Sequence, residues 1–157
     1  MDEPILPDSL ICGTGTARSQ LTALQKVECL RHVDLFSHAT VEELVRLAAI
    51  SAEVHFRAGD MIFGEGDIGD ALYVVIRGRV SLTRSGTEDN ETVSSLRAFG
   101  TYSVLTREPR YFTAEALEDT FALRIDAEDF FDLLSHNMEI VVGIFKLLAR
   151  KMGVAVF

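Results

Sequence analysis

The stretch GDMIFGEGDIGDALYVVIRGRV, residues 59–80, decides the fold, because short apolar runs alternate in it with closely spaced glycines. Met61–Phe63 and Leu72–Ile76 are typical of short buried strands, and a third run begins at Val80 and continues to Thr83. The glycines fall between these runs, where a tight corner needs a positive φ or a close backbone approach. The stretch therefore predicts antiparallel strands that turn sharply on one another.

Similar strand signals extend this pattern on both sides. Val54 and Phe56 alternate with polar residues before the stretch. Further strands are predicted after it, over Thr92–Leu96, Tyr111–Leu117 and Thr120–Ile125. Short strands at regular spacing with glycine turns favour a roll or barrel of about eight strands.

Helical periodicity frames the strands. A first helix is predicted from Ser19, with an apolar stripe made of Leu21, Leu24, Val27, Leu30 and Val33. Thr40 and Glu43 have the spacing of a capping box and predict the start of a second helix. After the last strand, Asp126 is placed to cap a helix, and a final helix begins near Met138.

These signals predict an α+β domain, in which an eight-stranded antiparallel β-roll, jelly-roll-like, is flanked by N-terminal and C-terminal helices. Residues 1–18, rich in proline and glycine, are interpreted as a flexible lead-in or linker, and residues 19–157 as the domain. Within the domain, residues 19–50 hold the N-terminal helices, 51–125 the roll and 126–157 the C-terminal helices.

Composition excludes several classes of function. The formal net charge is −9, and the arginines are scattered among acidic residues, so no nucleic-acid partner is expected. No apolar run approaches the roughly 18 residues of a membrane span, and the acidic N-terminus is unlike a secretory signal. Cys12 and Cys29 are interpreted as free thiols in a reducing compartment, which favours a cytoplasmic protein.

The sequence also lacks the side-chain groupings of catalysis. The histidines are dispersed, no Ser-His-Asp or Cys-His arrangement can be assembled, and Gly13–Thr16 lacks the lysine of a phosphate-binding loop. Glu65, Asp67 and Asp70 do not have the spacing of a calcium loop and are interpreted as a solvated turn. We therefore expect a protein that is not an enzyme and has neither a metal site nor a cofactor.

Residues 59–80 resemble the opening of the cyclic-nucleotide-binding domain family, the β-roll of catabolite activators and protein kinase A regulatory subunits. Residues 99–112 resemble the phosphate-binding cassette of that family, in which Phe-Gly opens a short helix and a Pro-Arg pair follows at a fixed distance. The spacing from Gly100 to Arg110 is the spacing of the family. The resemblance implies a regulatory module in which helix amides and a guanidinium bind a cyclic phosphate.

The resemblance assigns ligand contacts to Gly100, Thr101, Tyr102, Ser103, Arg110, Tyr111 and Phe112. Arg110 is the expected phosphate ligand; the alternative is a surface arginine paired with Glu108 or Glu115. The cassette is divergent, because Thr101 stands where the family has an acid that contacts the ribose 2′-hydroxyl. Tyr111 and Phe112 stand where the family has small residues, and on a strand they would face opposite sides. One of them would then stack on a purine or fill the pocket.

Two functions remain open at this point. The first is a regulatory module that binds cAMP or cGMP as part of a larger signalling or transport protein. The second is a degenerate domain that has lost the ligand and serves as a protein-interaction or dimerisation module. In either case the apolar C-terminal helix would contact an effector domain or form a homodimer.

Overall fold

A computed structural model describes residues 21–153 of the 157-residue chain, so the lead-in predicted for residues 1–18 lies outside the described residues. The helices are α1 (Ala23–Arg31), the 3₁₀ helix η2 (Asp34–Phe36), α2 (Val41–Ile50), α3 (Thr101–Thr106), α4 (Ala127–His136) and α5 (Met138–Lys151). The strands are β1 (Ser51–Phe56), β2 (Met61–Phe63), β3 (Ala71–Arg77), β4 (Val80–Thr83), β5 (Asn90–Val93), β6 (Ala98–Phe99), β7 (Thr113–Ala116) and β8 (Thr120–Asp126).

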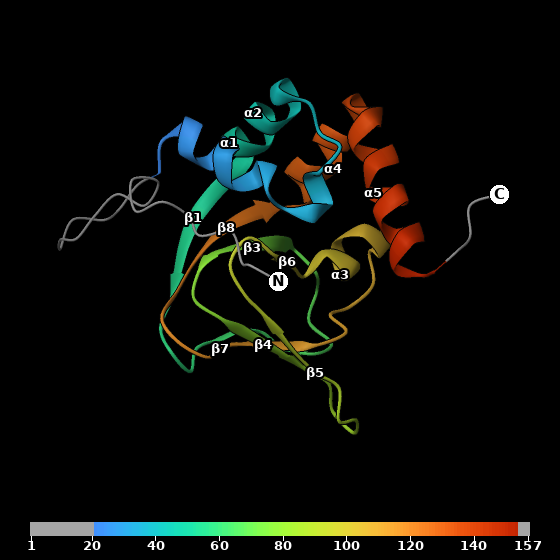
Figure 1. Cartoon of the computed structure of the whole chain (residues 1–157). Coiled ribbons are helices and arrows are strands. Elements are labelled where there is room, and N and C mark those ends of the chain that lie inside the picture. The colour runs from blue at the N-terminus through green and yellow to red at the C-terminus, as the bar shows by residue number, and fades with distance from the viewer. Residues whose placement is uncertain (1–20, 154–157) are drawn as a thin grey trace.

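The strands of the described region form two four-stranded antiparallel sheets, ordered β1-β8-β3-β6 and β2-β7-β4-β5. This confirms the predicted eight-stranded roll. Helices α1, α2, α4 and α5 gather on one side of the roll, and the β4–β5 hairpin projects on the other (Figure 1). The short α3 lies between α5 and the strands (Figure 1).

Strand β3 joins the two hydrophobic cores, because it is buried on both faces. Leu72, Val74 and Ile76 pack with the helices, whereas Tyr73 and Val75 point into the roll. A strand that is covered on both sides reads as a continuous apolar run, which is how it appears in the sequence.

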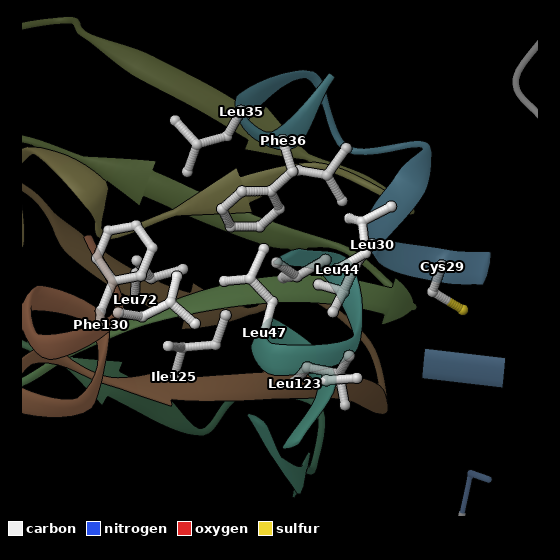
Figure 2. Close-up of a cluster of buried hydrophobic side chains, with 14 of the residues drawn as sticks. Cys29, Leu30, Leu35, Phe36, Leu44, Leu47, Leu72, Leu123, Ile125 and Phe130 are labelled. Carbon is white, nitrogen blue, oxygen red and sulfur yellow. The ribbon is translucent and has the colours of Figure 1, made fainter. Parts of the chain in front are cut away.

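The helix-facing core is centred on fully buried side chains from distant segments. Phe36 of η2 and Phe130 of α4 meet edge to face with ring centroids 6.3 Å apart, and Leu47 of α2 lies beside them (Figure 2). The predicted capping box is confirmed, because the Glu43 amide donates to Thr40 Oγ1 and the Thr40 amide donates to Glu43 Oε1. The core therefore fixes η2, α2 and α4 against the outer face of the roll.

The first helix is shorter than predicted. A capping box between Thr22 and Gln25 starts α1 at Ala23, and the helix ends before Val33, which is buried in the turn that follows. Leu24, assigned to the apolar stripe, is 77% exposed. Regular spacing in the sequence therefore did not distinguish this surface leucine from its buried neighbours.

Two predicted strands also differ. The strand predicted over residues 92–96 is observed as β5 at Asn90–Val93, and Leu96 lies in a turn with a φ of +64°. The strand predicted over residues 111–117 begins only at Thr113, so Tyr111 and Phe112 lie in a bend. The expectation that these two aromatics alternate across a strand is therefore wrong.

Candidate functional site

The start of α3 is built on a glycine. Gly100, the residue before the helix, has a φ of +77°. A Cβ atom at this position would lie 2.7 Å from Nη1 of Arg110 and 3.4 Å from the carbonyl oxygen of Ala71. Any other residue would be strained by its φ and would also collide with the arginine. Gly100 therefore allows the Arg110 guanidinium to lie directly against the backbone.

The Arg110 side chain is almost completely buried, with 1% of its surface exposed, although arginine is usually a surface residue. Nη1 donates hydrogen bonds to the Gly100 carbonyl oxygen and to Ser103 Oγ, each at 2.8 Å. Nη2 donates to the Ala71 carbonyl oxygen. The guanidinium carbon lies 4.0 Å from the centre of the Phe63 ring, in a cation–π contact. These contacts fix the orientation of the guanidinium.

The positive charge of Arg110 is only weakly neutralised. Asp70 Oδ1 lies 3.5 Å from Nη2, which is longer than a charge-assisted hydrogen bond, and the Asp70 side chain is 66% exposed. Within the described residues, Arg110 Nε is buried without a hydrogen-bond partner. Burial lowers the pKa of Arg110, and Tyr73 and Asp70 oppose that shift. A buried guanidinium with a spare donor can bind an anion.

The glycine-rich turn at residues 64–70 anchors the backbone of Arg110. The Arg110 amide donates to the Asp67 carbonyl oxygen, and the Gly66 amide donates to the Arg110 carbonyl oxygen, both at 2.8 Å. The Asp67 carboxylate accepts a hydrogen bond from the Gly64 amide at 2.8 Å. This acidic side chain therefore shapes the turn that holds the arginine.

The same turn sets the position of α3. A Cβ atom on Gly69 would lie 2.5 Å from Ser103 Oγ, so the glycine permits close contact between the turn and the helix. Ser103 is buried at this contact, where its hydroxyl accepts the hydrogen bond from Arg110. Glycines far apart in the sequence thus bring the turn, the helix and the arginine together.

A cavity of about 220 Å³ opens beside Arg110. The residues assigned to ligand contact from the sequence all line it: Gly100, Thr101, Tyr102, Ser103, Arg110, Tyr111 and Phe112. Sequence reasoning missed Glu91 of β5 and Lys151 of α5, which line the same cavity. No local motif marks these two residues, because β5 reaches the cavity by pairing with β4 and α5 reaches it by packing on the helices.

Exposed aromatic side chains form the rim of the cavity. Tyr102 is 51% exposed and Tyr111 is 40% exposed, and their ring centroids lie 5.7 Å apart. The Arg84 guanidinium lies 3.8 Å from the centre of the Tyr111 ring and donates to its hydroxyl. Tyr102 donates a hydrogen bond to Glu108 at 2.8 Å. The rim therefore offers flat surfaces, while the charge of Arg110 lies within.

The alternative interpretation of Arg110 as an exposed surface arginine is wrong, since its side chain is buried. Glu108 instead accepts the Tyr102 hydroxyl. Among residues 21–153, no helix is long and apolar enough to cross a membrane, and no group of three or more potential ligands could hold a metal ion.

Comparison with known proteins identifies the fold and the family. The profile of the cyclic nucleotide-binding domain matches residues 53–137, more than half of the chain. The cAMP-dependent protein kinase regulatory subunit of Dictyostelium discoideum is 30% identical over 114 residues, which cover 68% of this chain. The chain spans only 33% of the length of that subunit.

Two solved structures show the same arrangement. The N-terminal domain of a transcriptional regulator from Streptomyces coelicolor superimposes with a TM-score of 0.68 at 32% identity, covering 79% of this chain and 91% of that domain. The regulatory domain of Toxoplasma gondii protein kinase A, crystallised with cAMP, superimposes with a TM-score of 0.70 at 19% identity. The superposition covers 85% of this chain and 50% of that one, and at this identity it supports the fold alone. With a family profile that matches more than half of its residues and the two-sheet roll of that fold, the chain belongs to the cyclic nucleotide-binding domain family.

Proposed function

We propose that this chain is a regulatory module that binds a cyclic mononucleotide, with the cyclic phosphate at Arg110. The buried guanidinium with an unpartnered Nε atom is the observation that carries the proposal. A cyclic phosphate bears one negative charge and free oxygens, so it would accept the spare hydrogen bond and complete the charge neutralisation that Asp70, 3.5 Å from Nη2, begins. This assigns the chain a role in binding rather than catalysis.

The remaining cavity residues support a role for the sugar and base. The cavity of about 220 Å³ is smaller than the roughly 300–1,000 Å³ of typical ligand pockets. We therefore propose that the phosphate and ribose enter it, near Thr101 and Ser103, while the base lies against the exposed rings of Tyr102 and Tyr111 at the rim. cAMP is the first ligand to test, because the similar Dictyostelium subunit is named as cAMP-dependent.

Calorimetric titration with cAMP, cGMP and non-cyclic AMP tests the proposal. We expect a cyclic nucleotide to bind more tightly than AMP, and Arg110→Gln to weaken binding about ten- to a hundred-fold, the worth of a charge-assisted hydrogen bond. Arg79→Gln is the matched control, because Arg79 is exposed and pairs with Glu118 on the surface. Arg110→Lys, which keeps the charge, covers the case in which the glutamine variant fails to fold. Absence of binding by the wild-type protein at millimolar cAMP and cGMP would refute the proposal.

We further propose that α5 carries the contact with an effector domain or a second copy of the chain. Its exposed apolar side chains Met138, Val142 and Phe145 recur at intervals of four and three residues, which places them along one face of the helix, and exposed Met152 is its C-cap residue. Phe145→Glu should abolish any self-association measured by light scattering, whereas Lys146→Glu, on the neighbouring surface, should not. A wild-type chain that remains monomeric at all concentrations would refute the second copy as the occupant of this face.

This module would regulate an attached effector in a larger signalling or transport protein, as the length of the Dictyostelium relative suggests. A cytoplasmic location is part of the proposal. It is supported by Cys29, a free cysteine that is fully buried and suited to a reducing compartment.

A further inference from the structure

The carboxylate of Asp70 is shared between two arginines. Its Oδ1 atom lies 3.5 Å from Nη2 of buried Arg110, and its Oδ2 atom lies 3.4 Å from Nη2 of Arg124. Arg124 belongs to β8 and faces Tyr73 across the β3–β8 ladder, and 30% of its side chain is exposed. The negative charge of Asp70 is therefore divided between two guanidinium groups.

The second arginine continues the chain of contacts to α4. Nη1 of Arg124 lies 3.8 Å from Oδ2 of Asp126, the N-cap residue of that helix. Asp126 Oδ1 accepts hydrogen bonds from the amides of Glu128 and Asp129, at 2.9 and 3.4 Å. The Asp126 carboxylate therefore both pairs with Arg124 and caps the start of α4.

A backbone hydrogen bond also links Asp70 to the start of α4. The Ala127 amide, the first of α4, donates a hydrogen bond of 2.9 Å to the carbonyl oxygen of Asp70. Although burial lowers the pKa of Arg124, hydrogen bonding and charge interactions with Tyr73, Asp70 and Asp126 outweigh it, so that the net pKa is raised. Asp70 therefore contacts both the arginine of the cavity and the start of the helix.

We propose that Arg124 is a positioning residue that couples the occupancy of Arg110 to the first turn of α4, by way of Asp70 and Asp126. The coupling rests on the proposed function, because its trigger is an anion bound at Arg110. When the anion neutralises Arg110, Asp70 loses one of its two cations and is drawn to Arg124. Arg124 then turns from Asp126, which caps the Glu128 and Asp129 amides more tightly.

The reverse step follows by linkage, because coupling between two sites is reciprocal. If Arg124 is removed, the Asp70 carboxylate interacts with Arg110 alone. It then competes more strongly with the anion for the Arg110 guanidinium. Partly exposed ion pairs typically change an equilibrium by a few tenths to one kcal/mol, so Arg124→Gln should weaken cAMP binding about two- to five-fold. Asp70→Asn should strengthen it, because the competing carboxylate is lost.

A double-mutant cycle in cAMP affinity separates this coupling from a simple charge effect. Arg124→Gln, Asp70→Asn and the double variant are titrated with cAMP by calorimetry. If Arg124 acts through Asp70, its substitution should lose at least half of its effect, in log affinity, when Asp70 is already asparagine. Equal effects in both backgrounds would overturn the proposal. Arg79→Gln makes the same charge change away from these contacts and should leave the affinity unchanged.

Hydrogen exchange at α4 supplies a second readout that does not need the nucleotide. In the ligand-free protein, Asp70→Asn leaves Asp126 as the one carboxylate that pairs with Arg124 among the contacts described above, so the Glu128 and Asp129 amides should exchange about two- to five-fold faster. The same substitution in the Arg124→Gln background should have no effect. If Asp70→Asn leaves amide exchange unchanged in both backgrounds, the coupling is refuted. If exchange responds as expected but the protein does not bind cAMP, only the proposed function is refuted.

Discussion

Replacing Gly100 by alanine tests whether the cavity depends on the close approach of Arg110 to the backbone. Two costs are expected. An alanine held at a φ of +77° loses about 1–2 kcal/mol relative to its preferred conformations. The new Cβ atom, 2.7 Å from Nη1 of Arg110, adds an overpacking cost of about 1–3 kcal/mol, because the guanidinium is buried and cannot swing into solvent.

Gly86→Ala isolates the first of these costs. Gly86 has a φ of +73°, and an added Cβ atom would meet nothing within 4 Å. Urea unfolding should therefore show Gly86→Ala destabilised by about 1–2 kcal/mol, and Gly100→Ala by a further 1–3 kcal/mol or so. The two glycines have nearly the same φ but very different surroundings.

The same pair of variants separates stability from binding. Gly100→Ala displaces Arg110 from the Gly100 carbonyl oxygen and should weaken cAMP binding by about ten-fold or more in calorimetry. Gly86→Ala should bind as the wild type does. The reasoning fails if the two variants lose the same stability and bind cAMP with the same affinity.

Other substitutions test separate features of the structure. Gly69→Ala would place a Cβ atom 2.5 Å from Ser103 Oγ, so it should destabilise the fold by about 1–3 kcal/mol in urea and shift the amide resonances of α3; an unchanged α3 spectrum would contradict the packing. Burial raises the pKa of the Cys29 thiol to about 11, above the roughly 8.5 of an exposed thiol. The stability that the buried thiol contributes is complete below about pH 8.5 and is lost as the pH rises towards 11. Raising the pH between these values should therefore lower the free energy of unfolding less in Cys29→Ala than in the wild type. Thr101→Glu restores the acid found in the family and should tighten cAMP binding about ten- to a hundred-fold while leaving 2′-deoxy-cAMP unaffected; equal gains for both ligands would place the ribose elsewhere.

The features that were predicted correctly are those whose signals lie within a few residues of one another in the sequence. Strands β2, β3 and β4 were predicted within a residue or so, because glycine turns and apolar runs are properties of adjacent residues. The caps of α2 and α4 were predicted for the same reason, since a side chain caps amides two or three residues away.

The errors arise where the tertiary environment overrides the local pattern. Leu96 continues an apparent strand in the sequence but adopts a φ of +64°, while its buried side chain packs in the helix-facing core. Strand β6 escaped prediction because its two residues, Ala98 and Phe99, gain their partner only by pairing with β3. Tyr111 and Phe112 resemble strand residues, yet the hydrogen bonds of Arg110 to the neighbouring turn hold the preceding backbone away from β7 geometry.

The sequence by itself determined the roll, its flanking helices and the residues of the cassette, because stretch 59–80 and the spacing from Gly100 to Arg110 encode local turns and short strands. Only the tertiary structure decided the surroundings of Arg110. Its hydrogen bond to Ala71 spans 39 residues, and its ring contact with Phe63 and its distance from Asp70 also depend on how turns, helix and strands pack together. Burial and charge neutralisation are properties of that packing, so the spare hydrogen-bond donor of Arg110, on which the proposed anion site rests, is invisible in the order of the residues.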